Sequence, residues 1–243
     1  MKNLSRHQSP REIRRGFTLT ELLVVILIIA VLAALSMIGV QRIKQIADKA
    51  TSTRNLSQLQ TANAAYAIDH NGRYVSIRVN DSKGTPTRWF QNREFVANLI
   101  GDVMDNSGEQ ATTIPLQMLD PKVVRAREPL YDRLYCSYGM NDTGLPLGND
   151  PNLNSSHTTN TVADPARSMA FATATDFRVN YNSRLKWDFE NPKDAKTGDG
   201  AMAYRHGDKA LAVYFDGHVG EISAGDMKEI DKKGAKSNAF WNP

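Results

Sequence analysis

The sequence has very little cysteine. Cys136 is the only cysteine among 243 residues, which excludes an internal disulfide and a zinc site built from several cysteines. The sequence also has no internal repeats, no phosphate-binding glycine loop and neither the G-x-S-x-G nor the H-E-x-x-H motif. Hydrophobic residues make up 41% of the chain and charged residues 23%, and these proportions exclude wholesale disorder.

The body of the chain has no net charge. The whole chain carries +4 at pH 7. That excess lies entirely in the first sixteen residues, where one acid, Glu12, is outnumbered by Lys2, Arg6, Arg11, Arg14 and Arg15. A neutral body offers no general phosphate-binding surface, so we expect no nucleic-acid partner.

Only one stretch is apolar enough to cross a membrane. Leu22–Gly39 holds 18 residues and no charge. With Phe17–Thr20 added, it is long enough to span, because a helix rises about 1.5 Å per residue through about 30 Å of hydrocarbon. The basic residues before it predict a cytoplasmic N-terminus and an exported C-terminal part.

Three kinds of segment fit this pattern: a cleaved secretory signal with a small-residue site near Ala34–Ser36, a plain signal anchor, or a processed assembly helix. Glu21 favours the third, because a carboxylate at the edge of a membrane helix needs a partner. If the chain is cut after Gly16, Phe17 becomes a free amine one helical turn before Glu21. In an assembly, the carboxylate of one subunit can then meet the amine of the next.

The residues from Arg14 to Glu21 and the apolar run after them closely resemble the type IV prepilin signature, which pilins and type II secretion pseudopilins share. The resemblance implies cleavage between Gly16 and Phe17 by a prepilin peptidase, and N-methylation of Phe17. It also implies that Glu21 acts in filament assembly. The sequence departs from the family at Ile38, where many members carry a helix-kinking proline.

The helix is expected to continue beyond the membrane. Apolar residues recur in steps of three and four at Val40, Ile43, Ala47, Ala50, Leu56, Leu59, Ala62 and Tyr66, which is typical of an amphipathic helix. No proline falls between Phe17 and Thr85, and Asn71-Gly72 supplies a left-handed end. The pattern predicts one helix of about 55 residues, or about 80 Å. Residues 66–74 also resemble the helix end of pseudopilins.

We therefore predict an α+β fold, with a long N-terminal helix packed on a small antiparallel β-sheet head with long loops. The predicted parts are a leader (1–16), a transmembrane and filament-core helix (17–39), an amphipathic helix (40–72) and a head (73–243). Within the head, the sequence predicts a helix over 93–104, strands over 134–140 and 168–174, and a long surface loop over 142–165. Trp89, Phe90 and Cys136 are expected to pack in the core.

The most distinctive feature of the head lies between Ala203 and Val219. Leu211, Val213 and Phe215 alternate with smaller or more polar residues, which predicts a half-buried strand. Asp216-Gly217 predicts a two-residue hairpin turn with both residues at positive φ, followed by a return strand over 218–222.

Nine residues separate His206 from Asp216. This spacing resembles the H-X9-DG motif at the C-terminal end of large prepilin-like proteins. Residues 138–141 also resemble the middle of the head in that group.

The same region contains side chains that can bind metals, namely Asp199, His206, Asp208, Asp216 and His218. Histidine and carboxylate ligands suit zinc, whereas carboxylates with backbone oxygens suit calcium. The alternative is a structural hairpin held by its turn and by side-chain hydrogen bonds, and we favour it. Strand alternation predicts that His206 and Asp208 point to one face and Arg205 to the other. Calcium is the candidate cofactor, since the resemblance permits a C-terminal calcium loop.

The resemblances imply a structural, non-enzymatic subunit of a type II secretion pseudopilus or a type IV pilus-like filament. The expected partners are like subunits or other pseudopilins through the N-terminal helix, the prepilin peptidase, an inner-membrane assembly platform and membrane lipid. The expected location is the inner membrane, crossed once, with the head in the periplasm until the subunit is extracted into a periplasmic or surface filament.

Two other functional classes stay open at this point. The first is a membrane-anchored, metal-dependent hydrolase centred on His206, Asp208, Asp216 and His218. The second is a fibre-borne adhesin or binding head with an aromatic groove at Trp89 or Trp187.

Overall fold

The computed structural model describes residues 17–80, 85–101, 113–126, 130–145, 155–187, 200–232 and 238–243. The chain divides into two compact units, Met1–Lys44 and Gln45–Pro243, and each is described by itself. We call the second unit the head.

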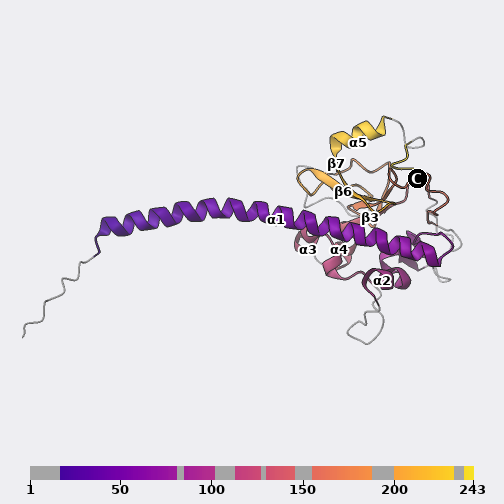
Figure 1. The fold of residues 1–243 in the computed structure, drawn as a ribbon, viewed down its shortest axis with the longest axis horizontal. Coiled ribbons are helices and arrows are strands. Elements are labelled where there is room, and N and C mark those ends of the chain that lie inside the picture. Colours follow the sequence, from indigo (N-terminus) through magenta and orange to yellow (C-terminus); the bar gives the residue numbers. More distant parts are fainter. Residues whose placement is uncertain are drawn as a thin grey trace, which may run out of the picture. The chain divides into compact units, whose positions relative to one another are not determined.

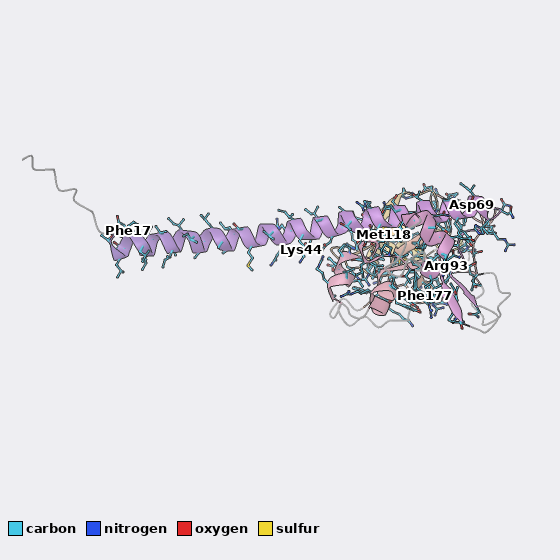
Figure 2. The ribbon with its side chains drawn as sticks, turned by 90° about the horizontal axis from the view of Figure 1, so that it is seen from below. Phe17, Lys44, Asp69, Arg93, Met118 and Phe177 are labelled. Carbon is cyan, nitrogen blue, oxygen red and sulfur yellow. The ribbon has the colours of Figure 1, made fainter. Side chains whose placement is uncertain are left out.

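Helix α1 runs from Leu19 to Asp69 and contains 51 residues, which confirms the long N-terminal helix (Figure 1). In the first unit its apolar side chains are exposed, and Figure 2 shows them standing free around the helix between Phe17 and Lys44. The helix ends at the predicted left-handed pair, since Asn71 has a φ of 55° and Gly72 a φ of 79°. The Gly72 N–H donates to the Ala67 carbonyl at 2.8 Å, which satisfies a carbonyl of the last turn.

The head contains a five-stranded sheet with strand order β5-β3-β4-β6-β7. Its strands are β3 (Tyr138–Asn141), β4 (Met169–Thr173), β5 (Arg178–Val179), β6 (Lys209–Tyr214) and β7 (Val219–Ser223). Neighbouring strands are antiparallel except β3 and β5, which are parallel. A separate two-stranded ribbon pairs β1 (Arg78–Asn80) with β2 (Pro86–Arg88).

Short helices surround this sheet. They are η1 (Trp89–Gln91), α2 (Arg93–Ile100), η2 (Leu116–Met118), α3 (Pro121–Ala126), α4 (Leu130–Ser137) and α5 (Ala224–Asp231). Helix α2 confirms the helix predicted over 93–104 but ends earlier, because Gly101 has a φ of 77° and its N–H closes the last turn on Ala97. Figure 1 shows α5 directly after β7 and on the same side of the head.

Both faces of β6 are buried. Leu211 and Val213 pack into a core shared with α1, η1, α2 and α4. Ala210 and Ala212 pack into a second core shared with α5 and the C-terminal residues 240–241. The prediction of a half-buried strand is therefore wrong, because alternate side chains of β6 face two different cores and neither face is open to solvent. The head is three layers thick, with the sheet in the middle.

The predicted strand over 168–174 is confirmed as β4, which carries an irregularity that the sequence did not predict. Met169 pairs with Tyr214 and Phe171 pairs with Val213. Strand β4 therefore advances by two residues where β6 advances by one. This bulge places Ala170 and Phe171 in the same core although they are adjacent in sequence.

The strand predicted over 134–140 is wrong in its first half. Residues up to Ser137 belong to α4, and β3 begins at Tyr138 without an intervening loop. The loop predicted over 142–165 contains no helix or strand among its described residues, 142–145 and 155–165. It is not wholly a surface loop, however, since Asp142, Ser155, His157 and Val162 are buried.

Trp89, Phe90 and Cys136 lie in the core as predicted, each no more than 2% exposed. Trp187 is buried as well, at 5% exposure. The aromatic groove that would have supported an adhesin at Trp89 or Trp187 is therefore not formed by these side chains.

Candidate functional site

The first turn of α1 is closed by a reciprocal cap. Glu21 Oε2 accepts hydrogen bonds from the Thr18 N–H at 2.9 Å and from Thr18 Oγ1 at 2.7 Å. In return, the Glu21 N–H donates to Thr18 Oγ1 at 3.3 Å. This is a capping box, in which two otherwise unsatisfied N–H groups at a helix start are bonded.

The predicted assembly residues therefore lie at the very start of α1. Phe17 lies two residues before the first helical residue, Leu19, and is 77% exposed, and Glu21 lies in the first turn. Gly16, the other side of the predicted cleavage junction, lies outside the described residues. A carboxylate can accept about four hydrogen bonds, so the capping box leaves Glu21 with acceptor capacity for a neighbouring amine.

The helix behind this cap has the composition of a membrane span. By length and composition α1 can cross a membrane: its most apolar 18-residue window has a mean hydropathy of 3.1, and none of that window is buried. An exposed apolar surface of this extent requires lipid or other helices around it.

The second candidate site is the hairpin of β6 and β7, and its turn differs from the prediction. The Gly217 N–H donates to the Tyr214 carbonyl at 2.9 Å, and the Tyr214 N–H donates to the His218 carbonyl at 3.0 Å. These bonds enclose three residues, 215–217. Gly217 alone among them has a positive φ, of 94°. A three-residue loop ending in a left-handed glycine replaces the predicted two-residue turn.

A turn with two residues at positive φ does occur, at the other end of β6. Gly207 has a φ of 66° and Asp208 a φ of 58°, as a type I′ turn requires of its central pair. The His206 N–H donates to the Lys209 carbonyl across this turn at 3.0 Å. Asp208 is exposed there, so it does not converge with the buried His206 as predicted.

His206 instead bonds a carboxylate from the loop before α3. Its Nε2 lies 3.1 Å from Asp120 Oδ2, and both side chains are buried, with exposed fractions of 1% and 0%. Arg205 Nη1 lies 3.7 Å from the same Asp120 oxygen. The prediction that Arg205 faces away from His206 is therefore wrong, because the chain here precedes β6 and does not follow strand alternation.

This cluster stabilises the ionised form of Asp120. Burial alone would raise the pKa of the Asp120 carboxyl, but the hydrogen bond from His206 and the positive charge of Arg205 outweigh it, so the pKa lies below its usual value. The Lys122 N–H also donates to Asp120 Oδ1 at 2.9 Å. The carboxylate therefore forms a satisfied buried centre that links the loop before α3 to the segment before β6.

The remaining residues of the motif form a separate pair on the surface. His218 Nδ1 lies 2.6 Å from Asp216 Oδ1, and the His218 ring stacks on Tyr214 with centroids 4.1 Å apart. Asp199 lies outside the described residues. Within the described ranges, no group of three or more His, Cys, Asp or Glu side chains is placed to hold a metal ion.

Two of these partners were not predicted from the sequence. The Thr18-x-x-Glu21 spacing is a capping-box signature that could have been recognised. Asp120 could not, because it precedes His206 by 86 residues and no spacing rule connects the two.

The N-terminal site is the one that comparison with known proteins identifies. Residues 13–37 match the family model described as the prokaryotic N-terminal methylation motif. No curated protein and no solved structure matches the chain. The matched residues include the predicted cleavage junction, the capping box and the exposed apolar part of α1. Together with that apolar helix, the match supports a prepilin-like, N-methylated protein with a membrane anchor near its N-terminus.

Proposed function

We propose that this protein is a pseudopilin, a structural subunit of a type II secretion pseudopilus or of a type IV pilus-like filament. The observation that carries the proposal is the coincidence of the methylation motif over residues 13–37 with a helix whose apolar side chains are exposed and whose first turn holds Glu21. Such a helix can bury its surface in lipid first and against like helices later.

The proposed course begins at the inner membrane, with the head on the periplasmic side. A prepilin peptidase cleaves between Gly16 and Phe17 and the new Phe17 amine is methylated. An assembly platform then extracts the subunit into a filament of like subunits or other pseudopilins. Glu21 pairs with the Phe17 amine of a neighbour, which lowers the cost of removing both charges from water.

We also propose that the head is structural rather than enzymatic and that it belongs to the prepilin-like group with the H-X9-DG motif. The hydrolase alternative required His206, Asp208, Asp216 and His218 to meet. His206 is buried against Asp120, Asp208 is exposed in a turn, and the Asp216–His218 pair lies at the opposite end of β6. The separation supports a role for the motif in holding the head together.

Processing is tested by the mass of the mature protein. We expect a chain that begins at N-methylated Phe17, and Gly16→Leu should leave uncleaved precursor because the peptidase site is blocked. A mature terminus near Met37 would instead identify a secretory signal and refute the proposal.

Assembly is tested at Glu21 with two variants. Glu21→Ala removes both the charge and the capping box, whereas Glu21→Gln keeps a capping side chain and removes only the charge. We expect both variants to insert and to be cleaved, and both to lose most sheared filaments, because the charge pair sets the register. Ser36→Ala is the control within the same helix. Among the described contacts, the Ser36 hydroxyl bonds only the Leu32 carbonyl, one turn earlier in that helix.

Wild-type filament yield from Glu21→Gln would contradict the charge-pair mechanism. It would show that the cap at the helix start, not the charge, is what assembly requires.

A further inference from the structure

Two cations follow the apolar run of α1 at once. Arg42 and Lys44 are exposed, and Figure 2 shows Lys44 on the stretch of α1 whose side chains stand free. The sequence contains no acidic residue from Leu22 to Ala47. Arg42 and Lys44 are therefore the only charged side chains in that stretch, and both are positive.

The acid best placed to neutralise Lys44 is already paired. Asp48 follows Lys44 by four residues, the spacing at which opposite charges meet on a helix. Asp48 is only 7% exposed, however, and pairs with Arg125 of α3. Within the described residues, no ion pair involves Arg42 or Lys44. Their charges are thus available to a partner from outside the chain.

The two cations lie at the depth of phospholipid headgroups if α1 crosses a membrane. As a helix, Phe17–Gly39 is about 34 Å long, enough for a hydrocarbon core of about 30 Å. Arg42 and Lys44 follow about 4.5 Å and about 7.5 Å beyond Gly39, whereas the headgroup layer adds about 5 to 7 Å on each side. Helical side chains tilt toward the N-terminus of their helix, so both cations lean back toward the membrane.

The neighbouring side chains also suit the edge of a bilayer. Gln41 lies three residues before Lys44, on the same face of the helix. Gln45 lies three residues after Arg42, likewise on its face. Each cation thus has an amide donor within one turn. Exposed apolar side chains are interleaved with these polar ones, and they are Val40, Ile43 and Ile46, with exposed fractions of 63%, 67% and 69%. The boundary between acyl chains and phosphates accommodates both kinds.

We propose that Arg42 and Lys44 bind the phosphate groups of anionic phospholipids, in the leaflet at the C-terminal end of the membrane span. The two residues are about 200° apart around the helix, so each meets a different lipid. Cations on the exported side of a span oppose the usual charge bias, and lipid phosphates offset them. The proposal rests on the membrane insertion of α1 given under the proposed function, and it does not depend on filament assembly.

The test uses the full chain purified from membranes, at pH 7.5, in lauryldimethylamine oxide micelles that contain equal amounts of phosphatidylglycerol and phosphatidylcholine with the same acyl chains. Native mass spectrometry counts the bound lipids. We expect a preference for phosphatidylglycerol, and we expect Arg42→Gln and Lys44→Gln each to lower that preference about fivefold, because a cation near an anionic surface contributes about 1 kcal/mol. The spectrum also gives the mass of the chain, so protein that begins at Phe17 is scored apart from precursor, whose leader carries further bases.

Arg54→Gln is the matched control, because Arg54 is an exposed base of the same helix in the head, twelve residues after Arg42. It should leave the preference unchanged. The proposal is overturned if the wild type binds both lipids equally, if the double variant of Arg42 and Lys44 keeps the wild-type preference, or if Arg54→Gln lowers it as much. It is equally overturned if 10 mM inorganic phosphate displaces the bound lipid, since the site would then recognise free phosphate.

Resistance of the protein to alkaline extraction from membranes separates this proposal from the proposed function. An inserted protein without lipid preference would refute the lipid contacts alone, whereas an extracted protein would refute the membrane anchor itself. Filament yield identifies the other occupant. If the double variant keeps its lipid preference but loses filaments, the two cations pair with acidic side chains of a neighbouring subunit and the proposal is wrong.

Discussion

At the scale of single residues, the histidine of the C-terminal motif acts through a partner far away in sequence. His206 and Asp120 are both buried and lie 3.1 Å apart. Removing one member of a buried hydrogen-bonded pair leaves the other with an unsatisfied group in the interior and costs more than losing a surface hydrogen bond. His218, in the same motif, is about half exposed and bonds Asp216 at the surface, where water competes for both groups and such a contact contributes little.

This contrast gives a matched pair of substitutions. We expect His206→Ala to lower the free energy of unfolding by about 2 kcal/mol, because the buried Asp120 carboxylate loses one of its hydrogen bonds. His218→Ala should lower it by less than about 1 kcal/mol. Urea unfolding of the full-length protein in detergent, followed by tryptophan fluorescence, measures both. Equal effects of the two variants would show that burial of the Asp120 pair is not what the motif provides.

At the scale of elements, α1 is fixed to the head by buried amides as well as by apolar packing. Asn63 Oδ1 accepts from the Val75 N–H at 3.0 Å, and Gln60 Nε2 donates to the Phe215 carbonyl at 2.9 Å. Asn55 Nδ2 donates to the carbonyls of Gln117 and Leu119. Each bond joins α1 to a different segment of the head, so a shift of the helix by one turn would break all of them. The amides thus set the register of α1 on the head.

Asn63→Leu tests this role. Leucine restores the volume but leaves the buried Val75 N–H without an acceptor, and we expect a loss of about 2 kcal/mol in the free energy of unfolding. Gln58→Leu is the control, because Gln58 lies on the exposed side of the same helix and should change stability by less than about 0.5 kcal/mol. The measurement is the urea midpoint of the full-length protein. A stabilised Asn63→Leu variant would show that apolar packing alone sets the register.

The elements that were predicted well carry strong local signals. Helix α1 has a long apolar run, then apolar residues in steps of three and four, and an Asn-Gly end, and β4 is a short apolar run. Helix α4 was missed because its aromatic and small residues suit a strand as well as a helix, and no breaker separates it from β3. The second core was missed because Ala210 and Ala212 are too small to predict burial, although Trp241 and other large residues cover them. Those contacts are set by tertiary packing.

At the scale of the whole molecule, stability against pH reflects two buried groups with opposite effects. Burial lowers the pKa of His157 from 6.5 to about 4, and its Nε2 lies 3.3 Å from the Asn141 carbonyl. Its contribution to stability is present above pH 6.5 and is lost as the pH falls through 4. Burial raises the pKa of Asp142 from 3.8 to about 6. Its contribution is present below pH 3.8 and is lost as the pH rises through 6.

The two effects nearly cancel in the wild-type protein. A pKa difference converts at about 1.4 kcal/mol per unit, so each group changes the free energy of unfolding by about 3 kcal/mol across its window. Between pH 6 and 4, the loss from His157 is offset by the gain from Asp142. We therefore expect these two groups together to leave stability nearly level over that range.

Substitution separates the two contributions. Asp142→Asn removes the stability that protonation of Asp142 adds as the pH falls. Its urea midpoint should therefore fall steeply from pH 6.5 to 4, because only the loss from His157 remains. His157→Gln keeps an amide donor for the Asn141 carbonyl but does not titrate, so its midpoint should rise over the same range. The double variant should return to the wild-type slope, because neither group titrates. The slope of the midpoint against pH is the readout, since it is insensitive to any constant packing loss at His157. If the midpoint of Asp142→Asn changes with pH as the wild-type midpoint does, then Asp142 is not protonated in the folded head near pH 6. The pH dependence must then come from other carboxyls. Asp176 is the nearest candidate, because it lies beside Arg178 and burial also raises its pKa.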